Sequence, residues 1–439
     1  MVIPAIHSCE INMKLLVRSV QIIDKKSPFN GQIKDLLIED GIIKEIGENL
    51  AADQAEIIET DKMCVSAGWL DMRVASRDPG FEHKEDLKSV RQAAARGGFT
   101  EIVLLPNSQP VVHSKDTLNY IRQSGTDELV KLHVTGSVSR KAEGIDFTEM
   151  IDLQKAGAIA FTDGEHPVQN ADLFLKTILY LQPMNALLMN RPEEKQLTLY
   201  GQMHEGMTST LIGMKGIPSL AEEMMLTRDL KLLEYALEKS MYKTDVPALH
   251  ISLISAGKSV ELIRKAKKKG LPISCDIAAH QLAFHDTDLI SFDTNLKVNP
   301  PFRSVFDSDA IKAGLSDGTI DVIVSDHSPH DEESKNLEFD HADFGITGLE
   351  TAFSLAIMHC GLSVEDVIEK LTAAPRRILR LSENRIEEGM KANLTFFEPE
   401  TEWSFDKSYS KSKNTPFLGK KLTGKVRGVI NNGKQEWYK

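Results

Sequence analysis

The sequence has few cysteines, no long apolar run and no excess of basic residues. Its four cysteines, Cys9, Cys64, Cys275 and Cys360, lie far apart among 439 residues. They lack the CxxC spacing of a zinc knuckle and the density of a disulfide framework, so we expect free thiols in a reducing, cytoplasmic compartment. No apolar run approaches the roughly 20 residues that cross a membrane, and residues 1–12 lack the features of a signal peptide.

The charge balance is acidic. Asp and Glu total 64 against 52 Lys and Arg, which gives a net charge of −12 and argues against nucleic acid as a partner. A hydrophobic content of 41% and a charged content of 26% are typical of a soluble globular protein. The length exceeds that of one ordinary domain.

From Gly68 onward, short β-branched runs alternate with helical segments. Runs near positions 69, 101, 132, 158, 186, 249, 273 and 322 make eight strands. This alternation predicts an α/β fold, a parallel sheet closed into a (β/α)₈ TIM barrel. Helices are expected over residues 115–124, 146–157, 170–181, 220–240, 259–269, 348–360 and 364–374.

Strand patterns also occur at both ends of the chain. Asp40-Gly41 and Asn432-Gly433 are hairpin signals between apolar runs. Since the terminal strands cannot leave apolar faces exposed, we expect them to pack together as a small composite β domain. The predicted boundaries are 1–66 for its N-terminal part (1–12 as a tail), 67–385 for the barrel and 386–439 for its C-terminal part. Residues 407–421 are expected to form a polar surface loop.

The stretch Val322-Ile-Val-Ser-Asp326-His327-Ser-Pro-His330 ends a buried strand with an acid and two imidazoles. The carboxyl ends of barrel strands are where active sites lie. An Asp at that place is suited to bind a metal or to move a proton. The alternative is a strand-end turn with polar side chains.

Five segments resemble dihydroorotases, which are cyclic amidohydrolases. The resemblance is to the dihydroorotase type that is fused to or associated with aspartate transcarbamoylase. The five segments are residues 68–86, 104–110, 294–303, 325–330 and 344–350. The resemblance runs from Lys14 to Lys439. It implies a metal-dependent barrel with a composite β domain, and the interconversion of carbamoyl aspartate and dihydroorotate in pyrimidine synthesis.

The family's metal-ligand positions are largely substituted. Its His-x-His pair corresponds to Arg73 and Ala75, and two further His positions to Asn190 and Leu253. Its Asp-Asp-Gly reads Asp163-Gly164-Glu165, so only Asp163 and Asp326 remain among the ligand positions. We therefore expect no metal, or zinc if the protein is an active enzyme. His166, His204 and His285 are left as candidates for an unrelated site.

Arg73 cannot replace a ligand, because a guanidinium has no lone pair to offer. It would repel a divalent ion by about 8 kcal/mol at 4 Å and an effective dielectric constant of 20. One hypothesis is that Arg73 supplies the positive charge itself and pairs with Asp326 or Asp163. The other is that Arg73 points elsewhere and Asp326 titrates normally.

The substrate-contact positions are better preserved. The resemblance assigns the substrate's carboxylate to Arg77 and Asn107, other ring contacts to Asn299 and His330, and a strand-end imidazole to His280. Asp326 stands at the position of the family's general base. For each contact residue the alternative is a side chain that stabilises a loop.

Three functions follow from these observations. The first is an inactive family member that serves as a structural or regulatory partner of aspartate transcarbamoylase. The second is an active dihydroorotase, or a related cyclic amidohydrolase, with a reduced metal site. The third is a metal-free module that binds dihydroorotate or carbamoyl aspartate. The resemblance also favours a homodimer.

Overall fold

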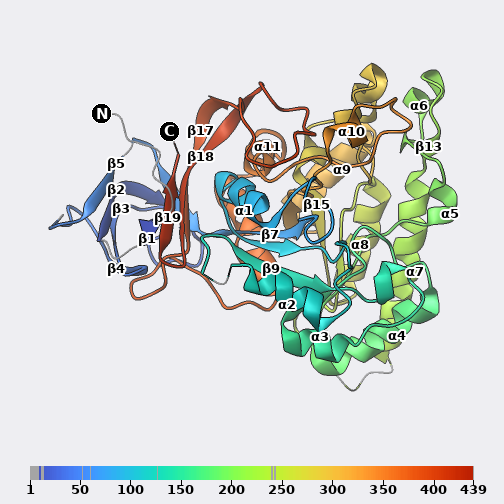
Figure 1. Cartoon of the computed structure of the whole chain (residues 1–439), viewed down its shortest axis with the longest axis horizontal. Coiled ribbons are helices and arrows are strands. Elements are labelled where there is room, and N and C mark those ends of the chain that lie inside the picture. Colours follow the sequence, from blue (N-terminus) through green and yellow to red (C-terminus); the bar gives the residue numbers. More distant parts are fainter. Residues whose placement is uncertain are drawn as a thin grey trace.

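The chain folds around an eight-stranded parallel barrel (Figure 1). The computed structural model describes residues 9–10, 14–51, 53–59, 61–125, 127–238, 241 and 244–438. Neighbouring barrel strands pair in the order β16-β15-β14-β11-β10-β9-β8-β7. These strands are β7 (Trp69–Val74), β8 (Phe99–Leu104), β9 (Lys131–Gly136), β10 (Ala158–Phe161), β11 (Leu188–Asn190), β14 (Leu249–Ile251), β15 (Ile273–Ala278) and β16 (Val322–Val324). All eight predicted strands are present.

The barrel closes where β7 meets the residues after β16. Val74 and His327 form a parallel bridge, and the Ala75 amide donates to the His327 carbonyl at 2.9 Å. Helices cover the outside of the barrel. They are α1 (Leu87–Arg96), α2 (Lys115–Gln123), α3 (Met150–Ala156), α4 (Ala171–Leu181), α7 (Ser219–Glu238), α8 (Gly257–Lys268), α9 (Val305–Ser316), α11 (Ala352–His359), α12 (Val364–Leu371) and α13 (Ala373–Ile378). The predicted (β/α)₈ fold is confirmed.

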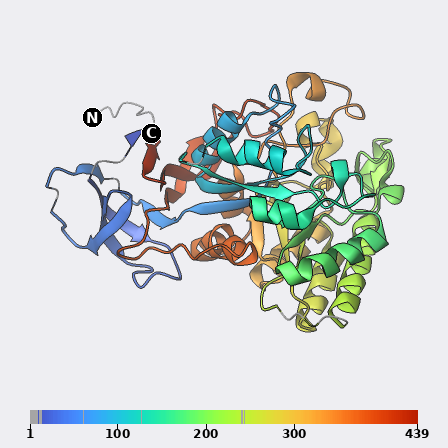
Figure 2. The same cartoon turned by 60° about the horizontal axis from the view of Figure 1, so that its bottom comes forward.

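Both ends of the described chain contribute to one further sheet beside the barrel (Figure 2). Its main order is β1-β19-β18-β17-β6-β2-β3-β4, with β5 paired to β2. The strands are β1 (Cys9–Glu10), β2 (Leu15–Ile22), β3 (Ile33–Glu39), β4 (Ile42–Gly47), β5 (Glu56–Glu59), β6 (Cys64–Ala67), β17 (Leu394–Ser404), β18 (Lys421–Asn431) and β19 (Lys434–Trp437). The composite β unit is thus formed by both termini.

The two hairpin signals act as predicted. Asp40 and Gly41 join β3 to β4 with φ of 51° and 69°, and Asn432 and Gly433 join β18 to β19 with φ of 51° and 71°. Asn, Asp and Gly tolerate this left-handed conformation, whose twist matches the flanking strands.

Three expectations need correction. Most of the predicted tail lies outside the described residues, but β1 pairs with β19 and is not free. The helix expected from residue 146 begins at Met150, because Thr148 first bonds back to Val138. Residues 407–421, expected to form a polar surface loop, contain several buried polar side chains. They are Ser408, Ser410, Ser412, Asn414 and Thr415.

A separate apolar cluster fills the barrel interior. Leu70, Val103, Leu187 and Val322 belong to it, and Ile378 of α13 packs into the same cluster. The described part of the barrel interior is therefore a packed core.

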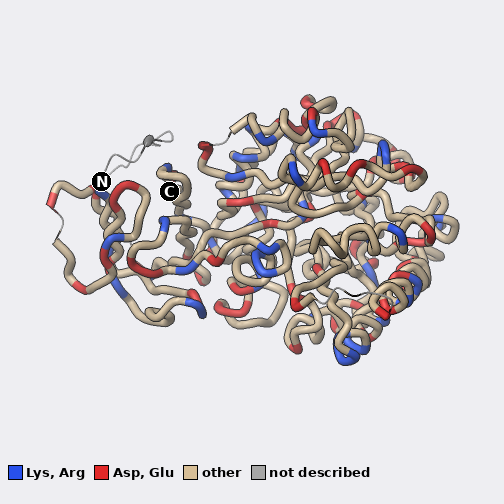
Figure 3. Tube along the Cα trace, turned by 90° about the horizontal axis from the view of Figure 1, so that it is seen from below, with Lys and Arg blue, Asp and Glu red and all other residues tan. Residues whose placement is uncertain are grey.

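Two surface features bear on possible partners. Among the described residues, no helix is both long enough and apolar enough to span a bilayer. Figure 3 shows basic and acidic residues intermixed along the trace.

The connection between β11 and α7 is an excursion made of α5 (Lys195–Thr198), β12 (Met203–His204), α6 (Met207–Leu211) and β13 (Gly216–Ile217).

Candidate functional site

A cavity of about 210 Å³ lies at the carboxyl ends of the barrel strands. Three guanidinium groups and three carboxylates line it, together with Asn299, Ser328 and His330. The charged residues are Arg73, Arg77, Arg191, Glu165, Asp326 and Asp343. The fold thus brings Arg73, Arg77, Asn299, Asp326 and His330 of the predicted site together. Asn107 and His280 are not among the lining residues.

Arg73 pairs with Asp326 in this cavity. The register of β7 against β8 shifts between Asp71 and Val74, an irregularity of the kind that re-aims side chains near active sites. The Arg73 Nε donates to the Asp326 Oδ1 at 3.0 Å, and its Nη2 donates to the Gly164 carbonyl at 3.4 Å. Burial raises the pKa of Asp326 to about 6, although Arg73 acts to lower it. The proximity of the guanidinium therefore only partly offsets the cost of burying this carboxylate.

Arg77 holds a second carboxylate. Its Nη2 lies 2.8 Å from the Glu165 Oε1, and its Nη1 donates to the Glu165 Oε2 at 3.1 Å. Burial acts to raise the pKa of Glu165, but the charge and hydrogen bonds of Arg77 outweigh it and bring this pKa to about 2. Glu165 is therefore ionised at neutral pH.

Asn107 and Asp163 lie behind the cavity wall. The Asn107 Nδ2 donates to the Asp163 carbonyl at 3.1 Å, and its Oδ1 accepts from the Glu165 amide at 2.9 Å. The Asp163 carboxylate accepts from the Ser139 amide at 2.9 Å and from the Ser139 hydroxyl at 2.5 Å. Burial raises the pKa of Asp163 to about 6, against the lowering effect of Ser139. Asp163 thus stabilises a loop, and the ion pair of Arg73 is with Asp326.

Arg191 and Asn299 meet on the other side of the cavity. The Arg191 Nη2 lies 2.5 Å from the Glu193 Oε2, and the Asn299 Nδ2 donates to that same oxygen at 3.2 Å. Asn190, one residue earlier, points away from this pair. Its Oδ1 accepts from the Val168 amide at 3.1 Å and its Nδ2 donates to the Asp229 Oδ2 at 2.7 Å.

His280 and Leu253 are buried just after β15 and β14, and His250 is buried within β14. Burial lowers the pKa of His280 to about 3, and its Nδ1 has no hydrogen-bond partner. The Leu253 amide donates to the Asp276 Oδ1 at 2.6 Å, and the His250 Nε2 lies 2.8 Å from the Asp276 Oδ2. The His250 Nδ1 lies 2.8 Å from the Ser274 Oγ, so both ring nitrogens of this buried imidazole are engaged by other side chains.

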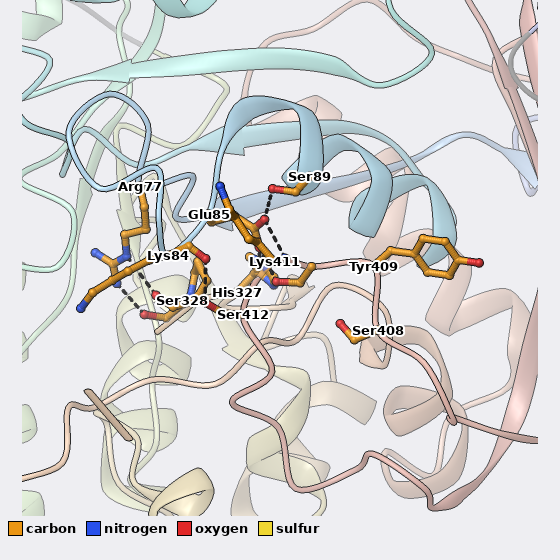
Figure 4. Close-up of polar contacts among 12 residues, drawn as sticks. Arg77, Lys84, Glu85, Ser89, His327, Ser328, Ser408, Tyr409, Lys411 and Ser412 are labelled. Atoms are coloured by element: carbon orange, nitrogen blue, oxygen red, sulfur yellow. Dashed lines mark hydrogen bonds and ion pairs between the residues drawn. The ribbon is translucent and has the colours of Figure 1, made fainter. Parts of the chain in front are cut away.

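A C-terminal segment, residues 408–415, contacts the loops that follow β7 and β16; we call it the strap. Figure 4 shows Glu85 between Ser89 of α1 and the strap. The fully buried Glu85 accepts from the Ser410 hydroxyl and from the Lys411 amide at 3.1 Å, and lies 3.3 Å from the His327 Nε2. The strap is thus joined to the residue that follows Asp326.

Asn414 of the strap positions the rim of the cavity. Its Oδ1 accepts from the His330 amide at 3.0 Å, and its Nδ2 donates to the Ser328 and Gly345 carbonyls at 3.0 and 3.1 Å. The His330 Nδ1 lies 3.1 Å from the Asp343 Oδ2. These contacts hold the His330 side chain at the edge of the cavity.

The residues present do not fit the metal that the resemblance implies. At the four positions that the resemblance assigns to metal-binding histidines stand a guanidinium paired with Asp326, a methyl group, an amide with both ends bonded and an isobutyl group; they are Arg73, Ala75, Asn190 and Leu253. None offers the imidazole or carboxylate donors that zinc takes. Among the described residues, no group of three or more His, Cys, Asp or Glu is arranged to hold a metal ion.

Sequence reasoning missed Glu165, Arg191 and Asn414. In the sequence Glu165 only interrupts an Asp-Asp-Gly motif, and its charge shortly after a barrel strand is the signal that points to a site residue. Arg191 follows β11 in the same way. Asn414 lies far along the chain from the barrel strands, and no local pattern connects it to them.

Comparisons with known proteins extend over nearly the whole chain. A family model described as Dihydro-orotase-like matches residues 62–244, and one described as Amidohydrolase family matches residues 203–435. A dihydroorotase from Pelotomaculum thermopropionicum is 37% identical over 430 residues, covering 96% of this chain and 98% of that protein. A dihydroorotase from Acetivibrio thermocellus is 38% identical, covering 95% and 98%.

Solved structures share the architecture. The L-hydantoinase (dihydropyrimidinase) from Arthrobacter aurescens superposes with a TM-score of 0.81 over 96% of both chains, at 20% identity. A D-hydantoinase from Bacillus sp. AR9 gives a TM-score of 0.78 at 17% identity, over 96% of this chain and 95% of that one. At such identities the likeness establishes the fold alone.

Proposed function

Because the chain belongs to the dihydroorotase family of amidohydrolases, we propose that it serves pyrimidine biosynthesis as a non-catalytic structural or regulatory partner of aspartate transcarbamoylase. The observation that carries this proposal is the ion pair between Arg73 and Asp326, with 3.0 Å between the Arg73 Nε and the Asp326 Oδ1. The resemblance assigns both of these positions to the metal centre that supplies hydroxide in the family reaction.

The chemistry explains why this pair matters. A cyclic amide resists attack by neutral water, and a bound zinc ion lowers the pKa of water from about 15.7 to about 7. At about 1.36 kcal/mol per pKa unit this supplies about 12 kcal/mol. A guanidinium provides positive charge but binds no water as a Lewis acid. Asp326 alone has no comparable means of generating hydroxide.

A partner surface is available on the excursion between β11 and α7. Tyr200, Met207 and Leu211 are 80%, 76% and 75% exposed. Exposed apolar side chains that gather into one patch favour a protein contact, and we propose that these three form such a patch. We assign this surface to aspartate transcarbamoylase and expect a homodimer to form through other faces. Neither contact requires the cavity to perform chemistry.

The first experiment separates the catalytic and non-catalytic readings. The purified chain is expected to contain zinc well below one ion per chain, and to turn over neither dihydroorotate nor carbamoyl aspartate above background. A matched variant combining Arg73→His, Ala75→His, Asn190→His and Leu253→His should gain zinc. Zinc near two ions per wild-type chain, with turnover that a chelator abolishes, would refute the proposal.

The second experiment concerns the partner. Aspartate transcarbamoylase from the same cells should co-purify with the wild-type chain and with Glu333→Ala, an exposed control. Co-purification should fail for the combined variant Tyr200→Glu and Leu211→Glu if its melting temperature is unchanged. Recovery of the wild-type chain without the transcarbamoylase, from cells that contain both, would contradict the partnership.

A second candidate function is an active dihydroorotase with a reduced metal site. The observation in its favour is that the curated relatives carry that name at 37–38% identity over nearly the full length. It requires Asp326 to leave Arg73, and it predicts metal-dependent turnover in the first experiment.

A further inference from the structure

The carboxylate of Glu165 lies in the cavity as a bound ligand's carboxylate would. We propose that Glu165 is a tethered internal carboxylate that occupies the cavity's anion site, and that removing it opens a binding site for small carboxylate ligands. The inference concerns the same cavity as the proposed function. It rests on the contacts of Glu165 alone and is independent of metal binding and turnover.

The geometry of the pair is that of guanidinium–carboxylate recognition. The two terminal nitrogens of Arg77 approach the two oxygens of Glu165, at 2.8 Å for Nη2 to Oε1 and 3.1 Å for Nη1 to Oε2. This two-point arrangement is the one in which arginine binds free carboxylates and phosphates. The site is therefore built for an anion and already holds one.

The rest of the Arg77 guanidinium is engaged. Its Nη2 donates to the Ser328 hydroxyl at 2.9 Å, and its Nε lies 3.4 Å from the Pro329 carbonyl. These contacts orient the side chain, which is only 9% exposed, while Glu165 remains 32% exposed toward the cavity. A second carboxylate cannot reach the same edge of Arg77 without displacing Glu165.

The backbone around Glu165 is anchored on two further sides. Its amide donates to the Asn107 Oδ1 at 2.9 Å, and its carbonyl accepts from the Arg191 Nη2 at 3.0 Å. The preceding Gly164 has a φ of +65°, and a Cβ there would lie 1.9 Å from the Asn107 Oδ1. Residues 164 and 165 therefore stay close to Asn107, with Glu165 directed at Arg77.

A carboxylate held in this way competes strongly with a free one. Attachment to the chain gives Glu165 an effective concentration far above that of a ligand in solution. When the side chain is shortened to a methyl group, Arg77 loses its partner and keeps its orientation through Ser328. The cavity of about 210 Å³ then also gains the volume that Glu165 vacates. A small, planar monocarboxylate suits that space.

The test uses the full chain and two probes, sodium acetate and L-dihydroorotate, with sodium chloride at matched ionic strength. Isothermal titration calorimetry should show no saturable binding to the wild type or to Glu333→Ala. Glu165→Ala should bind dihydroorotate with a Kd of about 1 mM or below, and acetate more weakly. Combining Glu165→Ala with Arg77→Ala should abolish the binding that was gained.

A second variant guards against misfolding. Glu165→Gln keeps the volume but removes the charge, so Arg77 is left uncompensated and added acetate should raise the melting temperature of this variant more than that of the wild type. The proposal is overturned if the wild type binds either probe as tightly as Glu165→Ala. It is equally overturned if a folded Glu165→Ala binds neither, or if acetate stabilises Glu165→Gln no more than chloride does.

Discussion

Replacing Arg73 by Met tests the electrostatic basis of the cavity. Met is close to Arg in length and apolar, so the variant removes the guanidinium and leaves Asp326 buried without its partner. The side chains of Arg73 and Asp326 are only 4% and 15% exposed. Breaking a buried pair by removing one partner costs about 3–5 kcal/mol. We therefore expect a loss of this size in the free energy of unfolding at pH 8.

The loss can be expressed as a melting temperature. Unfolding entropy of about 2.1 cal/mol/K per residue gives about 0.9 kcal/mol/K for 439 residues. The expected decrease for Arg73→Met is therefore about 3–5 °C at pH 8, measured by scanning calorimetry at a fixed scan rate. The combined variant Arg73→Met and Asp326→Asn should recover most of it, because no unpaired charge is then buried.

The pH dependence gives the sharper readout. Burial raises the pKa of Asp326 to about 6, above its ordinary value, so its ionisation costs wild-type stability as the pH rises from about 4 to 6. Without Arg73 that pKa rises further, and the loss continues above pH 6. The difference in melting temperature between wild type and variant should be small at pH 5 and large at pH 8. A difference that does not change with pH, or a double variant no more stable than the single one, would refute this reasoning.

Three further predictions concern the surroundings of the cavity. Glu85→Ala removes the acceptor for Ser410, Lys411 and His327. It should lower the free energy of unfolding by about 3 kcal/mol or more and speed amide hydrogen exchange in residues 408–415. Unchanged exchange there would show that the strap is held by other contacts. Gly164→Ala places a Cβ 1.9 Å from the Asn107 Oδ1 at a φ of +65°. It should lower the melting temperature more than the control Gly389→Ala, where φ is +82° but no atom lies within 4 Å. Equal decreases would mean that only the backbone strain of the positive φ matters, and not the contact with Asn107. Burial lowers the pKa of His280 to about 3. The neutral ring therefore stabilises the fold above pH 6.5, and the free energy of unfolding should decrease as the pH falls from 6.5 toward 3. An NMR titration in which this ring protonates near pH 6 would contradict the prediction.

Much of the fold was readable from local pattern. The eight barrel strands and the two hairpins follow from β-branched runs and from Asp-Gly and Asn-Gly pairs, which act over a few residues. The helix boundaries were less accurate where a tertiary contact intervened. Thr148 bonds back to Val138, and this delays the start of α3 until Met150. A contact of this kind has no signature in a short window of sequence.

The sequence likewise indicates only part of the candidate site. The resemblance to dihydroorotases singled out Arg73, Ala75, Asn190 and Leu253 from the sequence alone, and it left Asp326 and Asp163 as the possible partners of Arg73. Only the structure selects Asp326, because the Arg73 Nε donates to its Oδ1 while Ser139 donates to the Asp163 carboxylate. The buried role of the strap was not predictable either, since serines and lysines alone are typical of a solvated loop.

The sequence by itself determined the barrel, the composite sheet and the family. These properties depend on residue type and on short-range periodicity, which survive without coordinates. The tertiary structure alone decided which charge meets which, namely Arg73 with Asp326, Arg77 with Glu165 and Glu85 with the strap. The reason is physical: the strength and direction of an ion pair depend on separation and burial, and both are set by chain segments that lie up to several hundred residues apart.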